Sequence, residues 1–369
     1  MLPAFRSNRN AAGFLALLVA ISALPLLVRP SWLPPRTEIY SAIPWRFGGH
    51  PGFQKTLFGQ KGNLDIAFIG SSRVWCGVNS LYVQGKLSQS LGRDAEVATV
   101  GWNTAGFDAL YFITEDLLQN RKVNMLVVDD EYNSEIGGSR PHRLASRWFR
   151  TADNGHDLNG LSLFAAVGYH ASAALGMPRN LLGLVRRNRP IRVSPDNKFS
   201  PETLYRSQDP GNFLGALCVE ENFDDLTGAF VRYQPATRIS PDNVVVFSPT
   251  TRHSFGLSSR QLPDLQVHFA RKLAALAKQN HAKLIFLHYP AIDEVSADAI
   301  REAAIWPEIL DGDVAWVGIP PVTFFQGMTE PEARKLFSDP KHLNRNGQEY
   351  FTPLITEKLV ELYHAEKNS

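Results

Sequence analysis

The chain has 369 residues, of which 44% are hydrophobic and 20% charged, so it can bury one large core or two modest ones. This composition excludes a disordered or a fibrous protein. With 38 basic and 36 acidic residues the formal net charge is +2, which is too balanced to indicate nucleic acid or an acidic surface as the main partner.

The N-terminal segment is apolar from Ala11 to Val28 apart from Ser22, with Arg6 and Arg9 before it and Arg29 after it. That length is just enough for a helix to cross a bilayer. Arginines in a very short tail favour a cytoplasmic N-terminus and place the rest of the chain outside. The competing interpretation is a cleaved signal peptide, since small residues precede a cleavage point after position 23. Either interpretation predicts that the bulk of the chain is exported.

We therefore predict a single-pass protein of the inner (cytoplasmic) membrane with a periplasmic domain. Its segments are an N-terminal signal-anchor or transmembrane segment (1–35), a linker (36–62) and a domain over 63–369. The only two cysteines, Cys76 and Cys218, lie far apart and lack the spacing of a metal site. One disulfide and two buried free thiols both stay open, so the cysteines do not decide the compartment.

Beyond the linker, short apolar runs alternate with amphipathic stretches, which is typical of an α/β domain with a parallel sheet. Five strands are predicted at 64–69, 96–100, 125–128, 283–288 and 314–317. Helices are predicted at 78–91, 107–118, 261–279, 297–306 and 348–364. Between about 134 and 257 the alternation stops in a region with many Pro, Asn and Gly residues, so we expect a long insertion there.

Three polar clusters directly follow predicted strands: Gly70-Ser71-Ser72, Gly101-Trp102-Asn103 and Asp129-Asp130-Glu131. Ligands of open α/β sheets bind beyond the carboxyl ends of the strands, so these clusters should share one rim. For at least two of the three carboxylates in the last cluster, the favoured interpretation is a solvated strand end.

Two motifs stand at opposite ends of this pattern. Ile69-Gly70-Ser71-Ser72-Arg73 follows the first strand, and Asp339-Pro340-Lys341-His342-Leu343-Asn344, with Gly347 after it, precedes the last helix. Together they resemble the SGNH (GDSL-like) hydrolase superfamily, specifically its bacterial envelope-anchored members of the GSSR/DxxHLN type. The resemblance covers roughly 64–133 and 261–364. It implies a three-layer, flavodoxin-like SGNH fold with a central five-stranded parallel sheet, interrupted by the insertion and preceded by the transmembrane helix.

The resemblance assigns Ser72 as the nucleophile and the pair Asp339 and His342 as its base. The chemistry agrees, because a serine hydroxyl attacks at neutral pH only if an imidazole takes its proton. A carboxylate on the other ring nitrogen fixes the tautomer and stabilises the imidazolium, and Asp339 lies three residues from His342. The competing interpretation is structural: serines that cap a helix, and an Asp-Pro turn.

The oxyanion hole departs from the family pattern. When the last glycine of the family's usual N-x-G-x-x-G block is aligned with Gly106, Asn103 falls at the position of the oxyanion glycine. The backbone N–H of Ser72 is a further expected oxyanion donor. In the usual G-x-N-D block, Glu131 replaces the asparagine, and an ionised carboxylate cannot donate a hydrogen bond. We expect Asn103 or Asn133 to supply the missing donor, or the site to be weaker than a standard esterase.

Four further residues are candidates for substrate binding: Arg73, Trp102, Glu131 and His288. His288 ends the fourth predicted strand and so points toward the same rim, although a packing histidine is the commoner role. Trp102 has an aromatic face that suits a sugar ring, although tryptophan is more often part of the core. No phosphate-binding loop, CxxC pair or HExxH motif is present, so no metal and no cofactor are expected.

The leading functional hypothesis is an extracytoplasmic, membrane-anchored esterase or O-acyl (acetyl) transferase. Its substrate is an acylated envelope or secreted polysaccharide, or another envelope ester, and the reaction passes through an acyl-serine. The resemblance suggests a membrane-bound O-acyltransferase as a partner, and no nucleic acid. The alternative is a catalytically weak or inactive glycan-binding or scaffold subunit of a modification or export complex. A lipase or thioesterase is a third hypothesis.

Overall fold

The computed structural model describes residues 7–27, 35–41, 55–59, 62–102, 105–130, 160–169, 171, 230–247, 258–260, 263–295, 301–303 and 314–367. Asn103, Glu131, Asn133 and Cys218 lie outside these residues, as does most of the predicted insertion. Cys76 is buried and disulfide-bonded.

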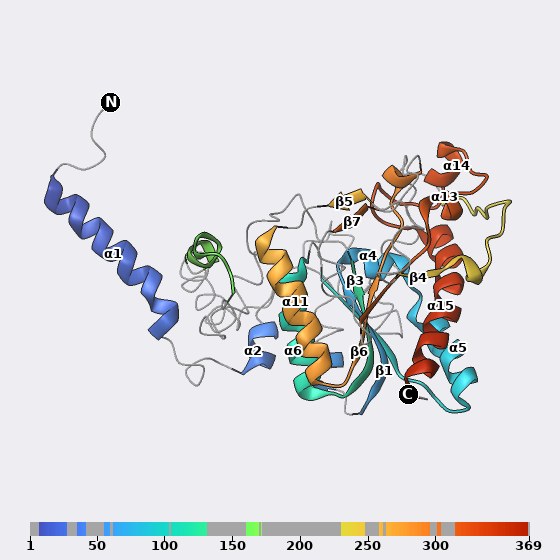
Figure 1. Cartoon of the computed structure of the whole chain (residues 1–369), viewed down its shortest axis with the longest axis horizontal. Helices are drawn as coiled ribbons and strands as arrows, with labels where there is room; N and C mark the ends of the chain where they lie inside the picture. The colour runs from blue at the N-terminus through green and yellow to red at the C-terminus, as the bar shows by residue number, and fades with distance from the viewer. Residues whose placement is uncertain are drawn as a thin grey trace, which may run out of the picture.

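The centre of the fold is a six-stranded sheet in the order β2-β1-β3-β6-β8-β4 (Figure 1). Its strands are β1 (Leu64–Gly70), β2 (Val97–Gly101), β3 (Val123–Asp129), β4 (Val245–Phe247), β6 (Lys283–Leu287) and β8 (Val314–Gly318). Five of them are parallel and correspond to the five predicted strands. Counted along the chain, these five lie in the order 2-1-3-4-5, the doubly wound order of flavodoxin-like sheets.

The predicted count of five strands is wrong, because β4 adds an antiparallel edge strand beside β8. β4 lies inside the segment predicted as an insertion, so that segment contributes to the sheet. A three-residue strand is too short to show a period in the sequence, and an antiparallel edge on a parallel sheet is common.

Helices cover both faces of the sheet, which makes three layers (Figure 1). One face carries α6 (Phe107–Asn120) and α11 (Asp264–Gln279), and the other carries α4 (Ser72–Gly77), α5 (Ser80–Leu91) and α15 (Arg345–Lys367). Side chains of a strand alternate between the faces, so Ala67 and Ile69 of β1 enter one apolar core while Ile66 and Phe68 enter the other. The mixed α/β fold with a mainly parallel sheet is thereby confirmed.

The described chain also contains several shorter elements. They are α2 (Arg36–Ser41), η3 (Lys55–Gly59), η8 (Pro241–Asn243), β5 (Ser258–Arg260), η10 (Ile292–Glu294), β7 (Arg301–Ala303), α13 (Pro321–Phe324) and α14 (Glu330–Arg334). β7 pairs with β5 in a separate parallel sheet of two strands, so the helix predicted over 297–306 is wrong at these positions. Alanine, glutamate and arginine favour a helix locally, but pairing with a distant segment overrides that weak preference.

The N-terminal helix α1 spans Asn8–Leu27. Within the part of the chain that the structure describes, no helix has the length and apolarity that a bilayer crossing requires. The transmembrane segment of the predicted fold therefore stays a prediction from the sequence.

Candidate active site

The predicted nucleophile lies where β1 turns into α4. Ser71 is the N-cap of α4, and its hydroxyl oxygen accepts a hydrogen bond from the backbone N–H of Arg73. Ser72 is therefore the first residue of a helix that starts at the carboxyl end of a central strand. Gly70 allows this turn, because a Cβ at this position would lie 2.7 Å from the Cβ of Asp129 on β3. A larger residue would push the turn away from β3.

The structure brings the two predicted motifs together. The Ser72 hydroxyl lies 2.7 Å from Nε2 of His342, although the two residues are 270 positions apart in the chain. Nδ1 of His342 lies 2.6 Å from Oδ2 of Asp339. With Nδ1–H donating to the carboxylate, Nε2 is left to accept the serine proton, as a Ser-His-Asp triad requires.

Asp339 is held by the loop that carries His342. Its other carboxylate oxygen, Oδ1, accepts the backbone N–H groups of Lys341 and His342 at 2.8 and 2.9 Å. Partial burial alone would raise the pKa of Asp339, but these hydrogen bonds and the contact with His342 lower it below its usual value. The carboxylate is therefore ionised at neutral pH and can only accept hydrogen bonds.

Two residues that end the second motif hold the His342 loop in place. The Asn344 side chain donates to the backbone carbonyls of Lys335 and Phe337 at 3.0 and 2.9 Å. Gly347 passes so close to this segment that an added Cβ would lie 2.2 Å from the carbonyl oxygen of Leu336. These positions of the motif therefore serve the geometry of the loop.

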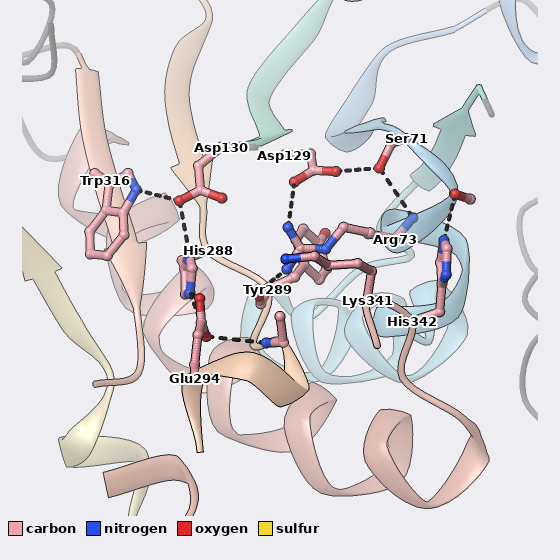
Figure 2. Close-up of polar contacts among 12 residues, drawn as sticks. Ser71, Arg73, Asp129, Asp130, His288, Tyr289, Glu294, Trp316, Lys341 and His342 are labelled. Carbon is pink, nitrogen blue, oxygen red and sulfur yellow. Dashed lines mark hydrogen bonds and ion pairs between the residues drawn. The ribbon is translucent and has the colours of Figure 1, made fainter. Parts of the chain in front are cut away.

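The turn from Gly70 to Arg73, called here the nucleophile turn, is supported by a buried ion pair shown in Figure 2. Asp129 accepts a hydrogen bond from the Ser71 hydroxyl at 2.6 Å, and its other oxygen lies 3.9 Å from the guanidinium of Arg73. Arg73 also donates to the backbone carbonyl of Tyr289. Asp129 is 0% exposed, so a solvated strand end is the wrong interpretation of this residue. Its neighbour Asp130, with 7% of its side chain exposed, is not solvated either.

The three described candidates for substrate binding are all buried. Arg73, Trp102 and His288 are 6%, 1% and 6% exposed. Trp102 packs edge-on against Tyr40 of α2, and both ring nitrogens of His288 are bonded to carboxylates. This arrangement does not support the predicted substrate contacts of these three side chains. The fourth candidate, Glu131, lies outside the described residues.

Of the predicted oxyanion donors, the structure describes the backbone N–H of Ser72. The N–H of Ser72 lies in the first turn of α4, where a helix leaves its N–H groups unpaired, and no described residue accepts its hydrogen. The N–H of Trp102 is already bonded to the carbonyl of Gly70. Asn103 and Asn133, the other predicted donors, lie outside the described residues, so their role stays a prediction.

Sequence reasoning missed Glu294, which lies beside His288 at the rim. Its signal in the sequence is weak, because it is one acidic residue in a loop after a predicted strand. Among the described residues, no group of three or more histidine, cysteine or acidic side chains is arranged to hold a metal ion.

The chain was also compared with known proteins. It matches no family model, and no curated protein and no solved structure matches it significantly. The geometry of the site is therefore the basis for assigning a function.

Proposed function

We propose that this chain is an SGNH-type serine esterase or O-acyl (acetyl) transferase. The observation that carries the proposal is the continuous hydrogen-bonded series from the Ser72 hydroxyl through His342 to Asp339, at 2.7 and 2.6 Å. The series lies at the carboxyl ends of the central strands, where doubly wound sheets place their ligands.

The geometry supports a two-step acyl transfer. Ser72 Oγ attacks the ester carbonyl while its proton passes to Nε2 of His342, and the N–H of Ser72 faces the developing oxyanion. The tetrahedral intermediate collapses, the C–O bond to the alcohol breaks, and His342 returns the proton to the departing oxygen. The acyl-serine is then attacked by water or by a second hydroxyl, with His342 again taking the proton. The bond between the acyl carbon and Ser72 Oγ then breaks, and His342 returns the proton to Ser72. Water makes the enzyme an esterase, and a sugar hydroxyl makes it a transferase.

The substrate class follows from the expected location. A domain tethered outside the inner membrane meets polysaccharides rather than metabolites, so we propose acylated envelope or secreted polysaccharide as the substrate. A membrane-bound O-acyltransferase is the proposed partner, since it can supply the acyl groups.

The test uses the chain without its N-terminal segment (residues 36–369) and a chromogenic acetate ester. We expect turnover, covalent labelling by a fluorophosphonate, and the loss of both in Ser72→Ala, with at least a 10³-fold fall in kcat because the nucleophile is gone. Ser90→Ala is the matched control, since it removes an exposed hydroxyl on α5 and leaves the nucleophile and its turn intact. Turnover that is unchanged in Ser72→Ala would exclude this nucleophile.

The second candidate function is a catalytically weak or inactive glycan-binding or scaffold subunit. The observation that favours it is that the end of β3 carries the buried carboxylates Asp129 and Asp130, near the place where the family has an asparagine donor. A wild-type chain that binds polysaccharide but is not labelled by the fluorophosphonate would support this second function.

A further inference from the structure

His288 lies at the carboxyl-end rim of the sheet, and both of its ring nitrogens are hydrogen-bonded. It follows β6, and its Nδ1 lies 2.9 Å from Oδ2 of Asp130 while its Nε2 lies 3.2 Å from Oε2 of Glu294 (Figure 2). The indole N–H of Trp316, on β8, donates to the same Asp130 oxygen at 3.0 Å. The ring therefore connects two acidic side chains that come from different parts of the fold.

This arrangement favours a protonated ring. A neutral imidazole has a single N–H and cannot donate to two carboxylates at once, whereas an imidazolium has two. Burial alone would lower the pKa of His288, but the charges of Glu294 and Asp130 and their hydrogen bonds raise it to about 10. On its remaining side, β8 contributes the uncharged ring of Trp316 and the backbone of Gly318.

On one side of the ring, the contacts lead to the nucleophile. Asp130 directly follows Asp129, and Asp129 holds Ser71 and Arg73, the two neighbours of Ser72. The backbone N–H of Asp130 also donates to the carbonyl of Leu287, so the ends of β3 and β6 are joined as well.

On the other side, the contacts lead to the loop that carries the base. Glu294 ends the short helix η10 and accepts the N–H of Ala291, which closes that turn. From the same turn, the N–H of Ile292 donates to the carbonyl of Pro340 at 3.1 Å. The carboxylate of Asp293 lies 3.2 Å from the ammonium of Lys341. Pro340 and Lys341 lie between Asp339 and His342.

We propose that His288 is a positioning residue of this active site, whose doubly hydrogen-bonded imidazolium ties the nucleophile turn to the His342 loop and sets the distance between Ser72 and His342. The inference rests on the proposed function. His288 touches neither the reacting serine nor the base, and it has no ring nitrogen left for a substrate. Its effect is on the alignment of two groups that come from opposite ends of the chain.

The consequence is a change in kcat rather than in KM. A misplacement of about 1 Å between reacting groups can cost on the order of 10²-fold in rate. We expect His288→Gln to lower kcat for a chromogenic acetate ester at least tenfold and to leave KM within about twofold, because this substitution removes the charge without opening the substrate site. His364→Gln is the matched control, since His364 bonds the Ser90 hydroxyl far along α15 and should retain wild-type kcat.

A second variant separates positioning from loss of packing. Glu294→Gln keeps the size of the side chain and removes one of the two charges that hold the proton on His288. In the wild type, activity should fall as pH rises through about 10, where the ring loses its second N–H. In Glu294→Gln this alkaline fall should move toward neutral pH, a shift that a purely structural role would not produce.

The protonation state can be measured without any activity. Nitrogen NMR of the histidine-labelled protein should show one side chain with both ring nitrogens protonated at pH 8, and this signal should be missing in His288→Gln. A single N–H at that pH would overturn the proposal, as would unchanged kcat in His288→Gln. A wild type that is never labelled by the fluorophosphonate would instead refute the proposed function, while the NMR result would still decide the charge on His288.

Discussion

The sharpest test of the catalytic series is the removal of the charge on Asp339 without removal of its shape. In Asp339→Asn an uncharged amide replaces the carboxylate that accepts the Nδ1–H of His342. The imidazole ring is then free to take the wrong tautomer. A buried aspartate in this role is worth on the order of 10⁴ in kcat. Here 49% of the Asp339 side chain is exposed, so water replaces part of the lost interaction. We therefore expect a fall of about 10² to 10³, which corresponds to about 3 to 4 kcal/mol of transition-state stabilisation.

The assay is a double-mutant cycle with Ser72→Ala, measured by turnover of a chromogenic acetate ester near pH 7. Residues that act as one unit give losses that do not add, so Asp339→Asn should cost almost nothing when Ser72 is already alanine. Asp94→Asn is the control, because Asp94 is an exposed carboxylate between α5 and β2 and is not part of the His342 loop. Losses that add in full, or a fall of less than threefold in the single variant, would refute the catalytic role of Asp339.

Two further predictions concern the stability of the fold. Gly347→Ala places a methyl group against the Leu336 carbonyl and should cost about 1 to 3 kcal/mol of unfolding free energy, measured by urea denaturation; Gly85→Ala, where the added atom meets nothing within 4 Å, is the control, and equal stabilities would contradict the packing argument. Burial alone would raise the pKa of Asp65, but hydrogen bonds from Arg93, Tyr363 and the Glu96 N–H lower it to about 2. Because the pKa of Asp65 is lower in the folded than in the unfolded chain, its ionised carboxylate adds roughly 2 kcal/mol to the free energy of unfolding. This stabilisation is present above about pH 4 and is lost as the pH falls toward 2. In Asp65→Asn the free energy of unfolding should therefore fall less steeply between pH 4 and pH 2 than in the wild type. An unchanged slope would rule out Asp65 as a source of the acid sensitivity.

The parallel part of the fold could be predicted because its strands are continuous apolar runs that are buried on both faces. β1 and β3 are the clearest cases, since their cores have no charged residue between Ile66 and Ile69 or between Met125 and Val128. β4 could not be predicted, because three residues carry too little pattern. The segment 301–303 could not be predicted either, because its strand depends on pairing with 258–260.

The candidate catalytic residues could be proposed from the sequence because each stands in a local motif, and the order of the strands then brings the motifs together. The roles of Arg73 and Asp129 could not. Each looks like a surface charge when its neighbours alone are considered, and the opposite charge lies 56 positions away in the chain. A buried ion pair is recognised only when both partners are placed.

The same reasoning explains why the irregular end of β3 is compatible with an active site. In the resembled family this place supplies an asparagine that donates to the oxyanion, whereas Asp129 and Asp130 can only accept while ionised. Asp129 is bonded to Ser71 and Arg73, the two neighbours of Ser72, and Asp130 is bonded to His288 and Trp316. The carboxylates therefore hold the site in shape. Stabilisation of the oxyanion is then left to the Ser72 N–H and to donors from other segments, and a chain built this way should be more sensitive to loss of its buried cations than to loss of polar groups at its surface.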